Sequence, residues 1–131
     1  MGQEGKDLAK VVNLNKIYFD LDKADIRPDA AIELAKILAV MNEYPNMEVD
    51  VRTHTDCRQT AKYNAALSDR RAKSIIAWLT EKGIAASRLT GRGYGESQLV
   101  NDCACEPTNK SKCTEEQHQA NRRSEFIIIK L

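Results

Sequence analysis

The chain has 131 residues, which is enough for one globular domain with a single core and too few for two ordinary domains. Its 20 Lys and Arg residues nearly balance its 19 Asp and Glu residues, so the overall charge gives no reason to expect nucleic acid or an anionic membrane surface as a partner. Aromatic residues make up only 5% of the chain, which argues against a surface that stacks on bases. Any ligand must therefore be recognised by a local group of side chains.

The four cysteines bear on the cellular compartment. They are Cys57, Cys103, Cys105 and Cys113, and an even number with three in one polar segment is typical of exported domains with disulfides. Met1 is not followed by the basic and apolar regions of a secretory signal, and no apolar run approaches the about 20 residues of a membrane span. We therefore expect a domain of an exported protein whose signal lies outside this sequence. A reduced cytosolic protein with unpaired thiols is the alternative.

The first elements in chain order are a linker, a strand and a helix. Residues 1–14 are polar and carry two glycines, as in the remnant of a linker. The apolar run 17–19 ends in acidic turn residues, which predicts a short strand. Pro28 suits the first turn of a helix, and Pro45 forbids its continuation. Between the two prolines, apolar residues recur at helical spacing: Ala31, Leu34, Leu38 and Met41.

A second strand and a second helix follow. Apolar and polar residues alternate over 47–54, so one face of this strand is expected to be buried and the other solvated. Ser68 can cap a helix that runs to Leu79, and Gly83 can take the left-handed position after its end. A shorter helical turn is expected over residues 63–67.

The last third of the chain predicts two more strands. Residues 87–96 indicate a short strand whose glycine-rich end is bulged. Residues 97–119 form a long loop with one helical turn near 115–119. Residues 126–129 are apolar in succession, as in a strand covered on both faces. The order βαβαβ-loop-β predicts an α/β fold, a two-layer sandwich with a mixed sheet.

Three groups of residues could carry chemistry. A cysteine nucleophile at Cys57 beside His54 lacks a recognisable orienting group and oxyanion site, so a structural, hydrogen-bonded His54 is preferred.

Zinc could use the four cysteines with His118, but C-x-C is not the usual zinc spacing, and disulfides are favoured. Closure between Cys103 and Cys105 would be strained, which leaves two pairings; we prefer Cys103 with Cys113 and Cys57 with Cys105.

The third group is ionic. Asp56 follows the second strand, Arg71 is expected in the first turn of the second helix, and residues 121–123, Asn-Arg-Arg, precede the last strand. Because strand ends and helix starts gather at one edge in this topology, an anion and two cations could line one cleft. The alternative is a weak surface pair of Asp with Arg.

Five motifs in register resemble the OmpA-like peptidoglycan-binding domain, which is found at the C-terminus of outer membrane protein A and in peptidoglycan-associated lipoprotein. They are "IYFDLDKADIRPDA", "HTD" at 54–56, "YNAALSDRRA" at 63–72, "GRGYGES" at 91–97 and "NRRSEF" at 121–126. The resemblance covers residues 15–131. Cys57 and the insert "NDCACEPTNKSKC" at 101–113 are absent from most members of the family but resemble a cysteine-bearing subgroup. The family usually has glycine where this chain has Thr53 and Gln59, which leaves the backbone of that loop open.

The resemblance implies a non-enzymatic periplasmic domain without a cofactor, which ties the outer membrane to the cell wall by binding peptidoglycan. Attachment to the outer membrane would use a part of the parent protein absent here. The ligand group is the diaminopimelate of the stem peptide, and by motif position its binding residues are Asp56, Asn64, Arg71, Asn121 and Arg122, with Asp20 as a further ligand-facing position. The alternative is a protein–protein interaction module of the same fold with a vestigial cleft.

The chemistry of this ligand suits these residue types. The free end of diaminopimelate carries an ammonium and a carboxylate on one carbon, so a receptor needs an acceptor beside a planar cation. We expect Asp56 to take the ammonium and Arg71 to take the carboxylate, helped by the amino-terminal end of its own helix. Asn64 can bond either group, and Arg122 adds a second cation.

Overall fold

The computed structural model describes residues 5–15, 17–20, 23–56, 61–95, 113–119 and 121–130. Its elements in chain order are α1 (Leu8–Val11), α2 (Pro28–Glu43), β1 (Glu48–His54), α3 (Ala61–Glu81), a 3-10 turn (Ala86–Arg88), β2 (Leu89–Gly95), α4 (Glu115–Gln119) and β3 (Ser124–Lys130). The strands form one sheet in the order β2-β1-β3, in which β1 runs parallel to β2 and antiparallel to β3. The predicted α/β sandwich with a mixed sheet is confirmed.

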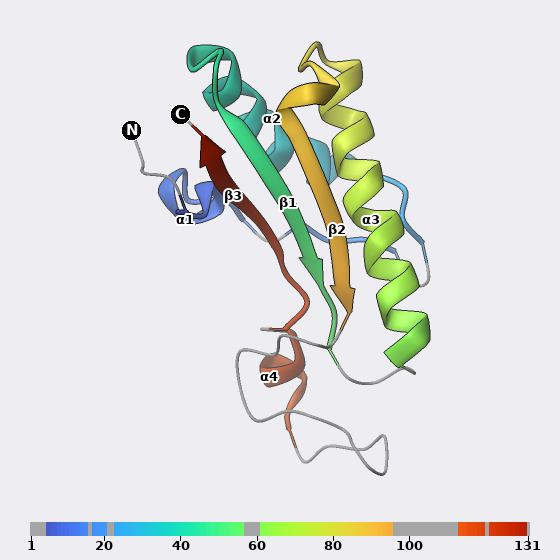
Figure 1. Ribbon diagram of the computed structural model, residues 1–131. Helices are drawn as coiled ribbons and strands as arrows, with labels where there is room; N and C mark the ends of the chain where they lie inside the picture. Colours follow the sequence, from blue (N-terminus) through green and yellow to red (C-terminus); the bar gives the residue numbers. More distant parts are fainter. Residues whose placement is uncertain are drawn as a thin grey trace.

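The core lies between the sheet and the two long helices. Figure 1 shows α2 behind the sheet and α3 alongside β2. Val49 and Val51 of β1 are fully buried while Asp50 and Arg52 are half-buried, so the predicted alternation is confirmed as far as Thr53. It fails at His54, which was expected on the solvated face and is buried. The apolar residues contributed by α2 and α3 complete the cluster: Leu34, Ile37, Met41, Ala72, Ile75 and Leu79. None of the described helices is long and apolar enough to cross a membrane.

The carboxyl end of α2 is held by a single side chain. The helix starts at Pro28 and ends before Pro45, as predicted. The guanidinium of Arg88 donates hydrogen bonds to the backbone carbonyls of Met41 and Tyr44, each at 2.8 Å, and to that of Met47 at 2.9 Å. The bond to Met41 satisfies a carbonyl in the last turn of the helix, and the other two hold the segment between α2 and β1. They also fix where β1 begins relative to α2.

Residues 5–14 do not form the expected linker. The carboxylate of Asp7 accepts hydrogen bonds from the backbone N–H of Ala9 at 3.0 Å and of Phe126 at 2.8 Å, which starts α1 and joins it to β3. Leu8 is completely buried in the core. The polar composition of residues 5–14 gave no sign that they pack against the sheet. One buried leucine and one capping aspartate are enough to hold so short a segment there.

The expected strand over 17–19 is also wrong. Ile17 is buried, but Tyr18 is 44% exposed, and residues 17–20 carry no strand assignment. Both sides of β1 are already paired, and residues 5–7 pair with the outer edge of β3 through backbone bonds to Ile128 and a bridge to Ile127. The segment therefore contributes an apolar side chain to the core without joining the sheet.

Helix α3 is one continuous helix, not a turn followed by a separate helix. Ser68 therefore lies inside it, and its hydroxyl accepts a hydrogen bond from the backbone N–H of Gly95 at 2.9 Å instead of capping the helix. The correction also moves Arg71 from the first turn to the middle of the helix, so the helix terminus cannot assist it as expected. A Cβ at Gly93 would come within 3.0 Å of Asp69 N and Ser68 Oγ, so this glycine lets α3 approach β2 closely.

The remaining strand predictions hold in part. Thr53 pairs with Gly93 and His54 with Gly95, so β2 is bulged near its end as predicted. In β3, Phe126 and Ile128 are fully buried, but Ile129 is 45% exposed, so the strand is not covered on both faces. The predicted turn at 115–119 is confirmed as α4. Most of the predicted loop 97–119 lies outside the described residues.

Candidate ligand-binding site

The antiparallel pairing of β1 and β3 brings Asp56 to the residues that precede β3. Thr53 of β1 pairs with Ser124 of β3, and the backbone N–H of His54 donates to the carbonyl of Arg123 at 2.8 Å. The chain segment before Ser124 therefore lies beside the segment after His54. This register accounts for a contact between residues 66 positions apart, Asp56 and Arg122.

The carboxylate of Asp56 is nearly enclosed and carries a cationic partner. Its side chain is only 10% exposed, and its Oδ2 accepts a hydrogen bond from Nη1 of Arg122 at 2.6 Å. The other terminal nitrogen of Arg122 donates to Oε1 of Glu115 in α4. A desolvated carboxylate needs such a partner, because an unpaired charge is costly to bury.

Two side chains orient the backbone at Asp56. Asn64, in the first turn of α3, donates from Nδ2 to the carbonyl of Asp56 at 3.1 Å. The hydroxyl of Thr55 donates to the same carbonyl at 2.9 Å. Asn64 is 3% exposed, so it holds this peptide from inside the fold. The two bonds hold the peptide carbonyl of Asp56, whose side chain contacts Arg122.

Arg71 lies two helical turns after Asn64, in the middle of α3. Its Nε donates to the carbonyl of Lys23 at 2.9 Å and its Nη2 to that of Asp20 at 3.2 Å, while its guanidinium lies 4.8 Å from the ring centre of Phe19. Arg71 follows Asn64 by seven residues, which is two helical turns or about 10 Å along one face. The guanidinium bonded to Asp56 belongs to Arg122. The guanidinium of Arg71 is bonded to the backbone carbonyls of Asp20 and Lys23.

The two other predicted residues differ in burial. Asn121 is completely buried, and its backbone N–H donates to the carbonyl of His118 at 3.0 Å, which joins α4 to the start of β3. The Asp20 side chain is 64% exposed and lies 3.5 Å from Nη1 of Arg27. Contacts therefore connect Asp56, Asn64 and Arg122 in one set, and Asp20 with Arg71 in a second.

Sequence reasoning missed Glu115, although a signal was present. Thr114 and Gln117 form a capping box: the Thr114 hydroxyl accepts from the Gln117 N–H at 3.2 Å, and Oε1 of Gln117 accepts from the Thr114 N–H at 2.8 Å. The sequence predicts the helical turn at 115–119, and the pattern T-x-x-Q marks Glu115 as its first residue. Cys113, one residue earlier, is disulfide-bonded. Cys57, Cys103 and Cys105 lie outside the described residues.

His54 sits next to the site without entering it. Its side chain is fully buried, its Nε2 lies 2.7 Å from Oε1 of Glu125, and its ring stacks on Tyr94 at 5.4 Å between centres. Burial lowers the pKa of His54, and the nearby positive charge of Arg123 lowers it further. The predicted structural, hydrogen-bonded role of this histidine is confirmed.

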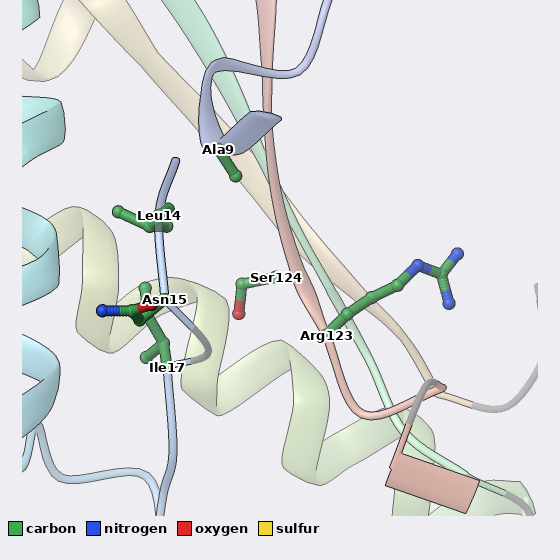
Figure 2. Close-up of a pocket in the computed structure, with 6 residues that line it drawn as sticks. All are labelled: Ala9, Leu14, Asn15, Ile17, Arg123 and Ser124. Carbon is green, nitrogen blue, oxygen red and sulfur yellow. The ribbon is translucent and has the colours of Figure 1, made fainter. Parts of the chain in front are cut away.

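A separate cavity of about 260 Å³ lies between the 9–17 segment and the start of β3. It is lined by Ala9, Leu14, Asn15, Ile17, Arg123 and Ser124. Figure 2 shows the side chain of Arg123 directed away from Asn15 and Ile17, so the guanidinium does not enter the cavity. None of the residues predicted to bind ligand lines it.

Comparison with known proteins gives the family of this chain. The OmpA family matches residues 18–112. Peptidoglycan-associated lipoprotein of Mesorhizobium japonicum is 37% identical over 103 residues, which cover 76% of this chain and 61% of that protein. Outer membrane porin F of Pseudomonas fluorescens is 36% identical over 122 residues, 92% of this chain and 35% of that protein.

A solved structure agrees at the level of the fold. The peptidoglycan-associated lipoprotein from Burkholderia pseudomallei superposes with a TM-score of 0.71 at 21% identity, over 87% of this chain and 90% of that one. The chain therefore belongs to the OmpA family. It spans 61% and 35% of the lengths of the two curated relatives described above.

Proposed function

We propose that this domain binds peptidoglycan non-covalently and so ties the outer membrane to the cell wall. Membership of the OmpA family supports this, together with relatives named peptidoglycan-associated lipoprotein and outer membrane porin. The domain would then lie in the periplasm, attached to the outer membrane through a part of the parent protein outside this chain. Binding needs no bond to be made or broken, so the role is not enzymatic and calls for no cofactor.

The proposed ligand group is the free end of diaminopimelate in the peptidoglycan stem peptide. The observation that carries this choice is an enclosed carboxylate, Asp56, bonded to the guanidinium of Arg122 and held by Asn64 at its own carbonyl. An acceptor and a cation in contact match an ammonium and a carboxylate on one carbon. A purely acidic or purely basic patch would match only one of the two groups.

Arg71 supplies the second cation in this proposal. Its guanidinium is bonded to the neutral carbonyls of Asp20 and Lys23. Hydrogen bonds between two charged groups are about twice as strong as neutral ones, so a ligand carboxylate can compete for these donors. Phe19, against which the guanidinium stacks, would keep it in place during the change. Asn121 supports the site from beneath, and Asp20 borders it.

Retention on isolated cell walls tests the proposal. The domain should sediment with purified sacculi that contain diaminopimelate, and free diaminopimelate should release it because the two compete for Asp56. Bovine serum albumin of matched concentration controls for trapping in the pellet. If the domain stays in the supernatant while a protein partner is captured from the same envelope extract, the interaction-module alternative replaces this function.

A further inference from the structure

We propose that Arg122 is an exchangeable partner of Asp56, and that Glu115 is the positioning residue that makes the exchange possible. A ligand ammonium would replace Arg122 on Asp56, while Glu115 keeps the guanidinium at the site, where it meets the ligand carboxylate. This inference rests on the proposed function and adds to it a residue outside the motifs shared with the family. It also gives Arg122 a specific task, the selection of diaminopimelate over lysine.

The geometry of Arg122 favours exchange over a fixed salt bridge. The guanidinium gives one terminal nitrogen to Asp56 and the other to Glu115. Arg122 gives each carboxylate one bond, not the two parallel N–H bonds that make an arginine–carboxylate pair strongest. Releasing Asp56 therefore breaks one bond and leaves the other, so the cation does not have to return to bulk water.

Burial decides which carboxylate the ligand takes. The Asp56 side chain is 10% exposed, that of Arg122 is 33% exposed, and that of Glu115 is 61% exposed. The buried carboxylate of Asp56 must always have a cationic partner, whereas water can hydrogen-bond to the exposed carboxylate of Glu115. An arriving ammonium can thus replace Arg122 on Asp56 without leaving a buried charge unpaired.

Glu115 is held where this exchange requires it. It begins α4, directly after Thr114, whose capping box with Gln117 fixes the first turn of the helix. Cys113, two residues before Glu115, is disulfide-bonded, which restrains the approach to the helix. The backbone N–H of Asn121 bonds the carbonyl of His118, so α4 is also tied to the residue before Arg122.

The exchange predicts selectivity between two natural stem-peptide residues. Diaminopimelate and lysine both offer a terminal ammonium to Asp56, but only diaminopimelate offers a carboxylate to the displaced Arg122. With lysine, Arg122 gives up a bond to Asp56 and gains none in return. Arg122 should therefore favour the diaminopimelate peptide and oppose the lysine peptide.

Titration calorimetry with two tripeptides tests this. The probes are L-Ala-γ-D-Glu-meso-diaminopimelate and the same peptide ending in L-lysine, applied to the folded wild-type chain and to Arg122→Gln and Glu115→Gln. Arg122→Gln should weaken the diaminopimelate peptide about tenfold or more and leave the lysine peptide equally tight or tighter. Glu115→Gln should weaken the diaminopimelate peptide about threefold and the lysine peptide less, because only the diaminopimelate carboxylate depends on where Glu115 holds Arg122.

A double variant and a neighbour complete the design. Because Glu115 acts only through Arg122, adding Glu115→Gln to Arg122→Gln should change neither affinity further. Glu116→Gln, next along α4 and exposed, should behave as wild type. Equal weakening of both peptides by Arg122→Gln, or additive effects in the double variant, would overturn the exchange alone. A folded wild-type chain that binds neither peptide would overturn the proposed function with it.

Discussion

At the scale of single residues, sequence grouped Asp56 with Arg122 but did not show that the two are bonded. Asp56 could be singled out because it follows an alternating strand within a known motif. Its bond to Arg122 depends on the pairing of Thr53 with Ser124, and no local pattern encodes an antiparallel register between segments so far apart. Arg71 was predicted in a first helical turn because Ser68 looks like a cap. The serine instead bonds the N–H of Gly95, a tertiary contact that sequence alone does not reveal.

His54 should make folding stability depend on pH. Burial and Arg123 lower its pKa in the folded state, so the unfolded chain takes up a proton first as the pH falls below about 6.5. The contribution of neutral His54 is therefore complete above that pH and is lost as the pH falls toward the lowered pKa. Urea unfolding at pH 7.5 and 5.5 should show lower stability at pH 5.5.

The matched variant for this prediction is His54→Gln, which can still donate to Glu125 but does not titrate in this range. Its free energy of unfolding should change less between the two pH values than that of the wild-type chain. Equal changes in both proteins would assign the pH dependence to other groups.

At the scale of elements, prediction succeeded where a pattern was long and failed where it was short. Helix α2, between Pro28 and Pro45, and the alternating strand β1 each had enough residues to give a clear period. Helix α1 has four residues and depends on Asp7 and Leu8, and the 17–19 run has three. Such short segments are decided by which sheet edge is still available, and that is a property of the whole fold.

The contact between α3 and β2 depends on Gly93. A Cβ there would come within 3.0 Å of the α3 backbone at Asp69, and backbone cannot move aside as a flexible side chain can. Gly93→Ala should therefore lower the free energy of unfolding by about 3 kcal/mol or more. Urea denaturation followed by circular dichroism measures this.

Gly83→Ala separates steric from conformational effects. Gly83 has a φ of +108° and nothing within 4 Å of a built Cβ, so alanine there should cost only about 1–2 kcal/mol. If Gly93→Ala costs no more than Gly83→Ala, the close approach of α3 to β2 is not what requires the glycine.

At the scale of the whole molecule, the α/β sandwich and its family were predictable because several motifs occur in register along the chain. Sequence predicts a link between the cysteine-bearing segment and the proposed site only through Cys57, and a second link through α4 was not predictable. It runs from the disulfide-bonded Cys113 through Glu115 to Arg122 and Asp56. The bonds of Arg122 depend on the register of β1 with β3 and on the backbone bond from Asn121 to His118, which ties α4 to the residue before Arg122.

The cysteines should form two disulfides, Cys103 with Cys113 and Cys57 with Cys105. Each closes a loop and should stabilise the folded chain by about 2–4 kcal/mol. Thiol titration of the unfolded, unreduced protein should find no free thiol, and mass spectrometry of unreduced peptides should recover the two pairs. Four reactive thiols, or one tightly bound zinc ion, would contradict this prediction.

The central claim is that Asp56 and Arg71 act on one ligand with opposite charges, and calorimetry with the diaminopimelate tripeptide tests it most directly. Asp56→Ala leaves the ligand ammonium without its acceptor, and Arg71→Ala leaves the ligand carboxylate with Arg122 alone, so each should cost about 2–5 kcal/mol of binding free energy. Arg70→Ala, at an exposed neighbour on α3, should bind as wild type. Thermal unfolding confirms that each variant is folded. If both folded alanine variants bind as tightly as the wild-type chain, the ligand site does not lie at Asp56 and Arg71.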